Sequence, residues 1–123
     1  MLLKLSILLG LFMTSNVVRP VFSDRLLYIF GDPEDKLLVE QQIQLMKNMR
    51  VEIKDRALKI IKVSAGSSLY QAYQLKSGHF MVVLIGKDGI EKYRTNVLLQ
   101  PAELFSLIDA MPMRQEEMRK KQQ

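Results

Sequence analysis

The chain has 123 residues, with 18 basic and 13 acidic side chains, a formal net charge of +5 and no cysteine. Without a thiol it cannot work as a thiol–disulfide oxidoreductase or a thiol peroxidase, because both need a cysteine nucleophile. The basic excess is mild and partly due to the cluster Arg119, Lys120 and Lys121. No basic stripe with interleaved aromatic residues is present, so we expect no nucleic-acid partner.

Residues 1–23 have the pattern of a secretory signal peptide. Lys4 stands near the start of an apolar run that reaches Met13, and polar and small residues follow up to Ser23. The run is shorter than the roughly 20 apolar residues that a membrane-spanning helix needs. We therefore expect cleavage after Ser23 and an exported protein, either periplasmic or extracellular. The alternative is an uncleaved segment that tethers the protein to a membrane.

The first predicted elements of the mature chain are a strand and a long helix. Arg25–Phe30 is a short apolar run that predicts a strand covered on both faces. Asp32 is then expected to cap a helix, with Pro33 in its first turn and its end near Asn48. The apolar face of this helix consists of Leu38, Val39, Ile43, Leu45, Met46 and Met49.

The remaining elements alternate between short apolar runs and turn or helix signals. The Asp88-Gly89 pair predicts a tight hairpin turn between two of the strands. In chain order we expect a strand at Ala57–Val63, a short helix from Ser67 or Ser68 to Leu75, a central strand at Phe80–Ile85, an outer strand at Ile90–Arg94, and a helix from Pro101 that Pro112 ends.

These elements predict one α/β domain over residues 24–113, followed by a charged C-terminal tail over 114–123 that is expected to fray. The order β-α-β-α-β-β-α indicates two parallel crossovers followed by a hairpin. It predicts a thioredoxin-like fold, with a mixed four-stranded sheet and helices on both faces.

Two segments of the C-terminal half resemble a known family. Phe80–Gly89 and Glu103–Arg119 are similar to a peroxiredoxin-related, thioredoxin-like family of unknown function, and Asp109–Arg114 (DAMPMR) is the most specific piece. The family occurs as small exported bacterial proteins and as a domain of animal extracellular sushi-repeat and coiled-coil-containing matrix proteins. The resemblance covers Arg25 to Arg119. It implies the fold and a location outside the cytoplasm, but no activity and no catalytic residues.

In redox relatives of this fold, the thiol lies where the first strand meets the first long helix. This chain has Asp32, Glu34 and Asp35 there, and a carboxylate beside a helix N-terminus is a helix cap and a poor base. The three acids lack the spacing of a calcium loop. His79, the only histidine, stands where thioredoxins carry a cis-proline. The alternative function is therefore an enzyme that uses His79 with Asp32 or Glu34 as an acid–base pair.

A basic strand is the other candidate for an interaction. Lys92 and Arg94 are expected to share a face with Ile90, and Lys87 lies nearby. These residues could bind an anionic partner, although charges on an edge strand also prevent edge-to-edge pairing. No metal or cofactor is predicted, because the methionines near the surface, Met111, Met113 and Met118, have no histidine partner. The leading hypothesis is a non-enzymatic binding module whose partner, a protein or a small anionic ligand, the sequence does not identify.

Overall fold

The computed structural model describes residues 22–123, and the predicted signal peptide falls almost wholly outside them. Nine elements follow one another in this part of the chain. They are β1 (Arg25–Phe30), α1 (Lys36–Met46), α2 (Arg50–Asp55), β2 (Leu58–Lys62), α3 (Leu69–Ala72), β3 (Met81–Ile85), β4 (Glu91–Thr95), α4 (Pro101–Asp109) and α5 (Pro112–Lys121). No helix among the described residues is both long and apolar enough to cross a membrane.

The strands form a single mixed sheet in the order β2-β1-β3-β4. β1 pairs in parallel with β2 and antiparallel with β3, while β4 is an antiparallel outer strand next to β3. The first predicted crossover is therefore confirmed. The second was wrong, because the chain returns from β2 through α3 into a strand that runs opposite to β1. The two most apolar strands, β1 and β3, lie at the centre, where both faces of a strand are buried.

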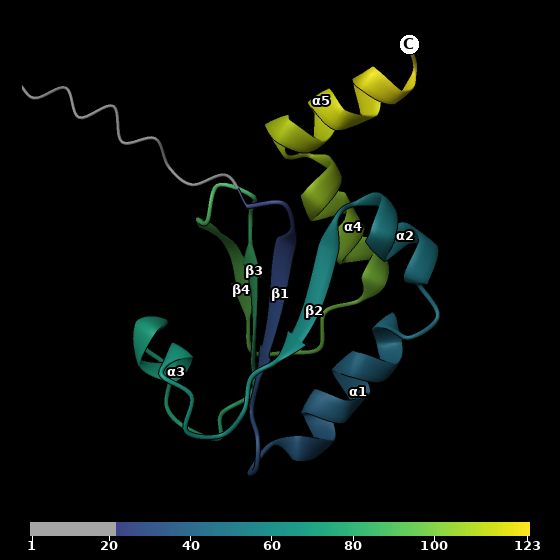
Figure 1. Ribbon diagram of the computed structural model, residues 1–123. Coiled ribbons are helices and arrows are strands. Elements are labelled where there is room, and N and C mark those ends of the chain that lie inside the picture. The colour runs from purple at the N-terminus through teal and green to yellow at the C-terminus, as the bar shows by residue number, and fades with distance from the viewer. Residues whose placement is uncertain (1–21) are drawn as a thin grey trace, which may run out of the picture.

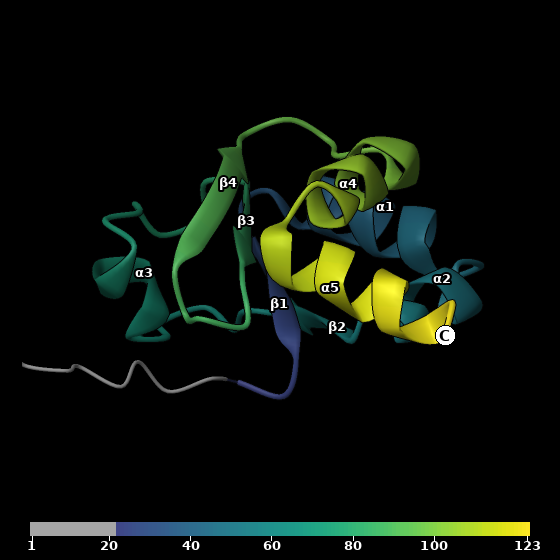
Figure 2. The same cartoon turned by 90° about the horizontal axis from the view of Figure 1, so that it is seen from above.

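Helices cover the two faces of the sheet unequally, as Figures 1 and 2 show from two directions. The helices α1, α2, α4 and α5 lie on one face, and the short α3 lies on the other. Alternation along β1 follows this division: Leu27 and Ile29 belong to the larger core under α1 and α4, and Phe30 to the smaller core under α3. The predicted α/β class with helices on both faces is confirmed.

The first helix begins later than the sequence predicts. Asp32 is not its N-cap and Pro33 is not in its first turn, because residues 32–35 form turns that contain a cis Asp32–Pro33 peptide bond. Asp35 has a non-helical backbone, with φ −104° and ψ 33°, and stands as the N-cap, so α1 begins only at Lys36. Residues 50–55, which follow the predicted end of the long helix near Asn48, form the short helix α2.

The C-terminal segment is also more ordered than predicted. Residues 112–121 form the helix α5, and its Arg114 side chain is only 3% exposed. Arg114 bonds to Asp55 at the end of α2 and to Asp109 at the end of α4, while Glu117 pairs with Arg25 on β1. The expectation of a frayed tail was wrong, because these ion pairs hold α5 against the rest of the domain.

Candidate functional site

Two places in the fold could carry a function: the turn between β1 and α1, and a pocket at the opposite end of the sheet. The turn, residues 31–35, occupies the position at which redox relatives carry their thiol. Its backbone is tied to two neighbouring elements. The Asp35 carboxylate accepts a hydrogen bond of 2.7 Å from the amide of Phe80, and the Gly31 amide donates to the Tyr70 hydroxyl over 3.0 Å.

The other predicted residues make separate contacts, although Asp35 and His79 line one surface hollow beside the turn. Asp32 pairs with Lys62 over 3.6 Å, and the Glu34 side chain lies so close to Gly78 that a Cβ there would collide with its carboxylate. His79 is exposed, and within the described residues its ring makes no hydrogen bond or ion pair with a carboxylate. Nor do residues 22–123 contain a group of three His, Cys, Asp or Glu side chains that could hold a metal ion. The contacts of this turn are therefore those of a structural joint.

This interpretation predicts a loss of stability for Asp35→Ala. The change leaves the amide of the buried Phe80 without its acceptor, which should lower the free energy of unfolding by about 1–3 kcal/mol. Chemical denaturation measures the effect. Glu34→Ala, at an exposed residue of the same turn, should change stability by less than about 0.5 kcal/mol. Equal stabilities of the two variants would contradict the structural role of Asp35.

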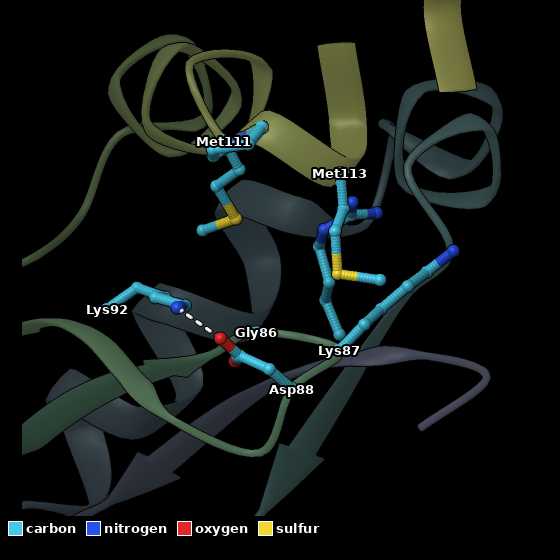
Figure 3. Close-up of a pocket in the computed structure, with 8 residues that line it drawn as sticks. Gly86, Lys87, Asp88, Lys92, Met111 and Met113 are labelled. Carbon is cyan, nitrogen blue, oxygen red and sulfur yellow. Dashed lines mark hydrogen bonds and ion pairs between the residues drawn. The ribbon is translucent and has the colours of Figure 1, made fainter. Parts of the chain in front are cut away.

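The pocket at the opposite end of the sheet brings together the hairpin between β3 and β4, the start of β1, and the junction of α4 with α5. We call it the basic pocket. It encloses about 250 Å³ and is lined by Arg25, Gly86, Lys87, Asp88, Lys92, Met111, Pro112 and Met113. Figure 3 shows Met111 and Met113 pointing from the α4–α5 junction toward the hairpin, where Lys92 and Asp88 form an ion pair.

An irregularity in β4 directs Lys92 into the basic pocket. Leu84 pairs with Tyr93 but Ile85 pairs with Glu91, so Lys92 is the extra residue of a β-bulge. A bulge turns a side chain away from the face that strict alternation would give it. Lys92 lines the pocket below α5, whereas Arg94 donates to the carbonyl of Tyr73, beyond α3 on the other face. The prediction that Lys92 and Arg94 share a face was therefore wrong.

Arg25 is the buried cation of the basic pocket. Its side chain is 1% exposed, although it carries a full charge at the start of β1. Nη1 and Nη2 donate to Glu117 over 3.3 and 3.1 Å, and Nη1 also donates to the Arg56 carbonyl over 2.7 Å. Arg25 Nε is buried and has no hydrogen-bond partner among the described residues. A buried donor without an acceptor is costly, and because Arg25 lines the pocket, its Nε–H is a donor that a ligand there could use.

The acids near the basic pocket stay ionised. Burial alone would raise the pKa of Glu117, but hydrogen bonds from Lys87 and Arg25 outweigh it and hold that pKa below its usual value. The hydrogen bond from Lys92 likewise lowers the pKa of Asp88. At neutral pH the site therefore contains three cations (Arg25, Lys87 and Lys92) against two carboxylates.

A second group of charges anchors the helix that forms the roof of the basic pocket. Arg114 donates to Asp109 over 3.0 Å and to Asp55 over 2.7 Å, and Arg56 donates to Asp109 over 2.8 Å. Hydrogen bonds from Lys121 and Arg114 lower the pKa of Asp55 to about 2. Asp109 and Arg114 are the first and last residues of the DAMPMR segment, and the residues between them include the roof of the basic pocket.

Two of the predicted interaction candidates line the basic pocket. Lys87 and Lys92 were predicted as interaction candidates, and the structure places both in its lining. Arg94, Asp32, Glu34, Asp35 and His79 lie elsewhere. No pattern in the chain singles out Arg25 or Glu117, which lie 92 positions apart. The family resemblance over Asp109–Arg114 was the one sequence signal for this pocket, since that segment contains the roof residues.

The fold and its two sites define a cysteine-free, thioredoxin-like domain. The chain belongs to the family described as Domain of unknown function (DUF4174), whose model matches residues 22–117. A solved structure of a thioredoxin-fold protein from Helicobacter pylori is similar, with a TM-score of 0.52 and 17% identity, covering 84% of this chain and 88% of that one. At that identity the likeness shows the fold alone. No curated protein matches the chain. The predicted resemblance to a thioredoxin-like family of unknown function is confirmed.

Proposed function

We propose that this domain is a non-enzymatic binding module, exported to the periplasm or out of the cell, and that the basic pocket holds the anionic group of its ligand. The observation that carries the proposal is the buried guanidinium of Arg25, whose Nε–H has no acceptor within the described chain. Lys87 and Lys92 line the same pocket and add positive charge. The N-terminal end of α5 forms its roof without a side-chain cap, and such an end favours an anion.

The acid–base alternative has less support. General acid–base chemistry needs a donor and an acceptor within hydrogen-bond reach of each other or of a shared substrate. His79 is exposed, while Asp32 is paired with Lys62 and Glu34 lies against Gly78. We therefore assign the function to the basic pocket and treat the turn after β1 as part of the scaffold.

The proposal predicts that small anions bind at the hairpin. Isotope-labelled protein is titrated with acetate and with inorganic phosphate, and the amide resonances of Gly86, Lys87 and Met113 are followed. At least one of the anions should shift these resonances with saturation. Lys87→Gln or Lys92→Gln should weaken its binding roughly tenfold, because hydrogen bonds between charged groups are worth about 1.5–3 kcal/mol.

Lys36→Gln is the matched control, since Lys36 is an exposed lysine at the start of α1, at the other end of the sheet (Figure 1). Its affinity should equal that of the unaltered protein. Shifts that appear equally in all variants, or that cluster around His79 and Asp35, would refute the assignment to the basic pocket.

Expressing the full chain tests export in the same preparation: a secreted mass that begins at Asp24 supports it, and a retained mass that begins at Met1 indicates a tether.

A further inference from the structure

We infer that the ligand of the basic pocket is a monocarboxylate carried on a short aliphatic chain. The inference rests on the proposed function, because it names the chemical class that the same pocket accepts. Three features of the pocket point to this class: the net charge of the site, the donors that Arg25 leaves unused, and the apolar side chains that face the hairpin.

The net charge of the site matches a monoanion. Arg25, Lys87 and Lys92 supply three positive charges, and Asp88 and Glu117 supply two negative ones. Among the five residues of these three ion pairs, one positive charge remains for the ligand. A single carboxylate neutralises it, whereas a doubly charged phosphate would leave an uncompensated negative charge beside two ionised carboxylates, which a partly buried site disfavours.

The free donors of Arg25 suit the shape of a carboxylate. A guanidinium has five N–H groups in one plane. Two donors of Nη1 go to Glu117 and to the Arg56 carbonyl, and one donor of Nη2 goes to Glu117. The Nε–H and the second Nη2 hydrogen remain, side by side on one edge of the plane. This edge is a fork that can donate one hydrogen bond to each oxygen of a carboxylate.

The upper wall of the basic pocket is apolar and adaptable. Met111, Pro112 and Met113 form it, and Figure 3 shows both thioethers directed at the hairpin. Methionine is flexible and polarisable and fits unbranched chains of differing length. Met113 is 40% exposed, so part of this apolar wall is open to solvent. A volume of about 250 Å³ fits a small ligand better than a large ring system.

The test compares hexanoate with acetate, inorganic phosphate, hexanol and hexylamine on the same labelled protein. Hexanoate should bind at least roughly tenfold more tightly than acetate, because each buried methylene is worth about fourfold in affinity. Phosphate should bind more weakly than hexanoate, and hexanol and hexylamine should not saturate the site. The methyl resonances of Met111 and Met113 should move with hexanoate, whereas that of Met46, which is 3% exposed in the core, should not.

Two variants separate the contributions that the carboxylate and the aliphatic chain of the ligand make to binding. Met113→Asn should remove most of the preference for hexanoate over acetate, because it replaces an apolar side chain of the upper wall. In Gly86→Ala the new Cβ would lie 2.6 Å from Lys92 Cε and 2.8 Å from Asp88 Oδ1, so it should displace this ion pair. The binding of both acetate and hexanoate should therefore become weaker. Both contacts are with flexible side-chain ends, so the fold should survive, as circular dichroism can verify.

The outcomes distinguish this inference from the proposal on which it rests. Equal affinities for acetate, phosphate and hexanoate at the hairpin would overturn the inference of a monocarboxylate on an aliphatic chain. They would not contradict the proposal that the domain binds anions at the basic pocket. Saturable binding of hexylamine or hexanol at the same resonances would also overturn it. Absence of binding by every anion would overturn both proposals.

Discussion

Arg114→Leu should lower the free energy of unfolding by about 2–3 kcal/mol, although it replaces a charged side chain with an apolar one of helix-forming type. Arg114 is 3% exposed and donates from all three guanidinium nitrogens, to Asp109 and to the carboxylate and carbonyl of Asp55. Leucine provides no donor, so these acceptors lose a partner. The expected loss is below that of a fully buried pair because Asp109 is 34% exposed and Asp55 is 40% exposed.

Denaturant unfolding measures this loss, and Arg119→Leu is its control. Arg119 lies on the same helix, is 68% exposed and, within residues 22–123, pairs only with Glu116. An exposed pair of this kind contributes little, so the control should change stability by less than about 1 kcal/mol. If the two variants were equally stable, α5 would not be anchored by Arg114. A loss of anion binding in Arg114→Leu is also expected, because Arg114 fixes the helix whose first residues form the roof of the basic pocket.

The sheet could be predicted because its signals are local. Runs such as Arg25–Phe30 and Phe80–Ile85 are apolar at nearly every position, and each run alone indicates a covered strand. The Asp88-Gly89 turn is equally local, and Gly89 adopts the positive φ of 76° that the pair suggests. The direction of β3 relative to β1 was not predictable in this way, because direction depends on the path that the chain takes through α3.

Burial of charged side chains was the main feature that the sequence concealed. Charged residues are almost always exposed unless they are paired, so Arg25 and Arg114 gave no sign of lying inside. Their partners are far away in the chain: Glu117 lies 92 positions after Arg25, and Asp55 lies 59 positions before Arg114. No periodicity connects residues at such separations. The same reason explains why the C-terminal segment was expected to fray.

The bulge in β4 had no sequence signal either, and it determines which side of the sheet Lys92 occupies. An alternating pattern places Lys92 and Arg94 on one face, and a single inserted residue separates them. The two lysines were nevertheless recognised as candidates because the hairpin itself was predicted. The candidate site thus combines predictable residues on a local turn with an unpredicted buried arginine beneath them.

Gln42→Leu should lower the free energy of unfolding by about 2–5 kcal/mol, the largest effect expected of a polar side chain in this domain. Gln42 is fully buried on α1. Its Nε2 donates to the carbonyl of Leu99 over 2.9 Å, and its Oε1 accepts from the Leu99 amide over 2.7 Å. One side chain therefore satisfies both backbone groups of a buried residue in the loop between β4 and α4. Leucine has a similar volume and no polar atom, so the change removes both hydrogen bonds without opening a large cavity.

The control is Gln44→Leu, at an exposed position of the same helix, which should change stability by less than about 0.5 kcal/mol. Hydrogen exchange gives an independent measurement, because the Leu99 amide should exchange much faster in Gln42→Leu and at the unaltered rate in Gln44→Leu. Slow exchange of Leu99 in both variants would mean that the loop finds another partner. Loss of protection confined to Leu99 and its neighbours would instead show that Gln42 holds α1 against this loop, as the two hydrogen bonds indicate.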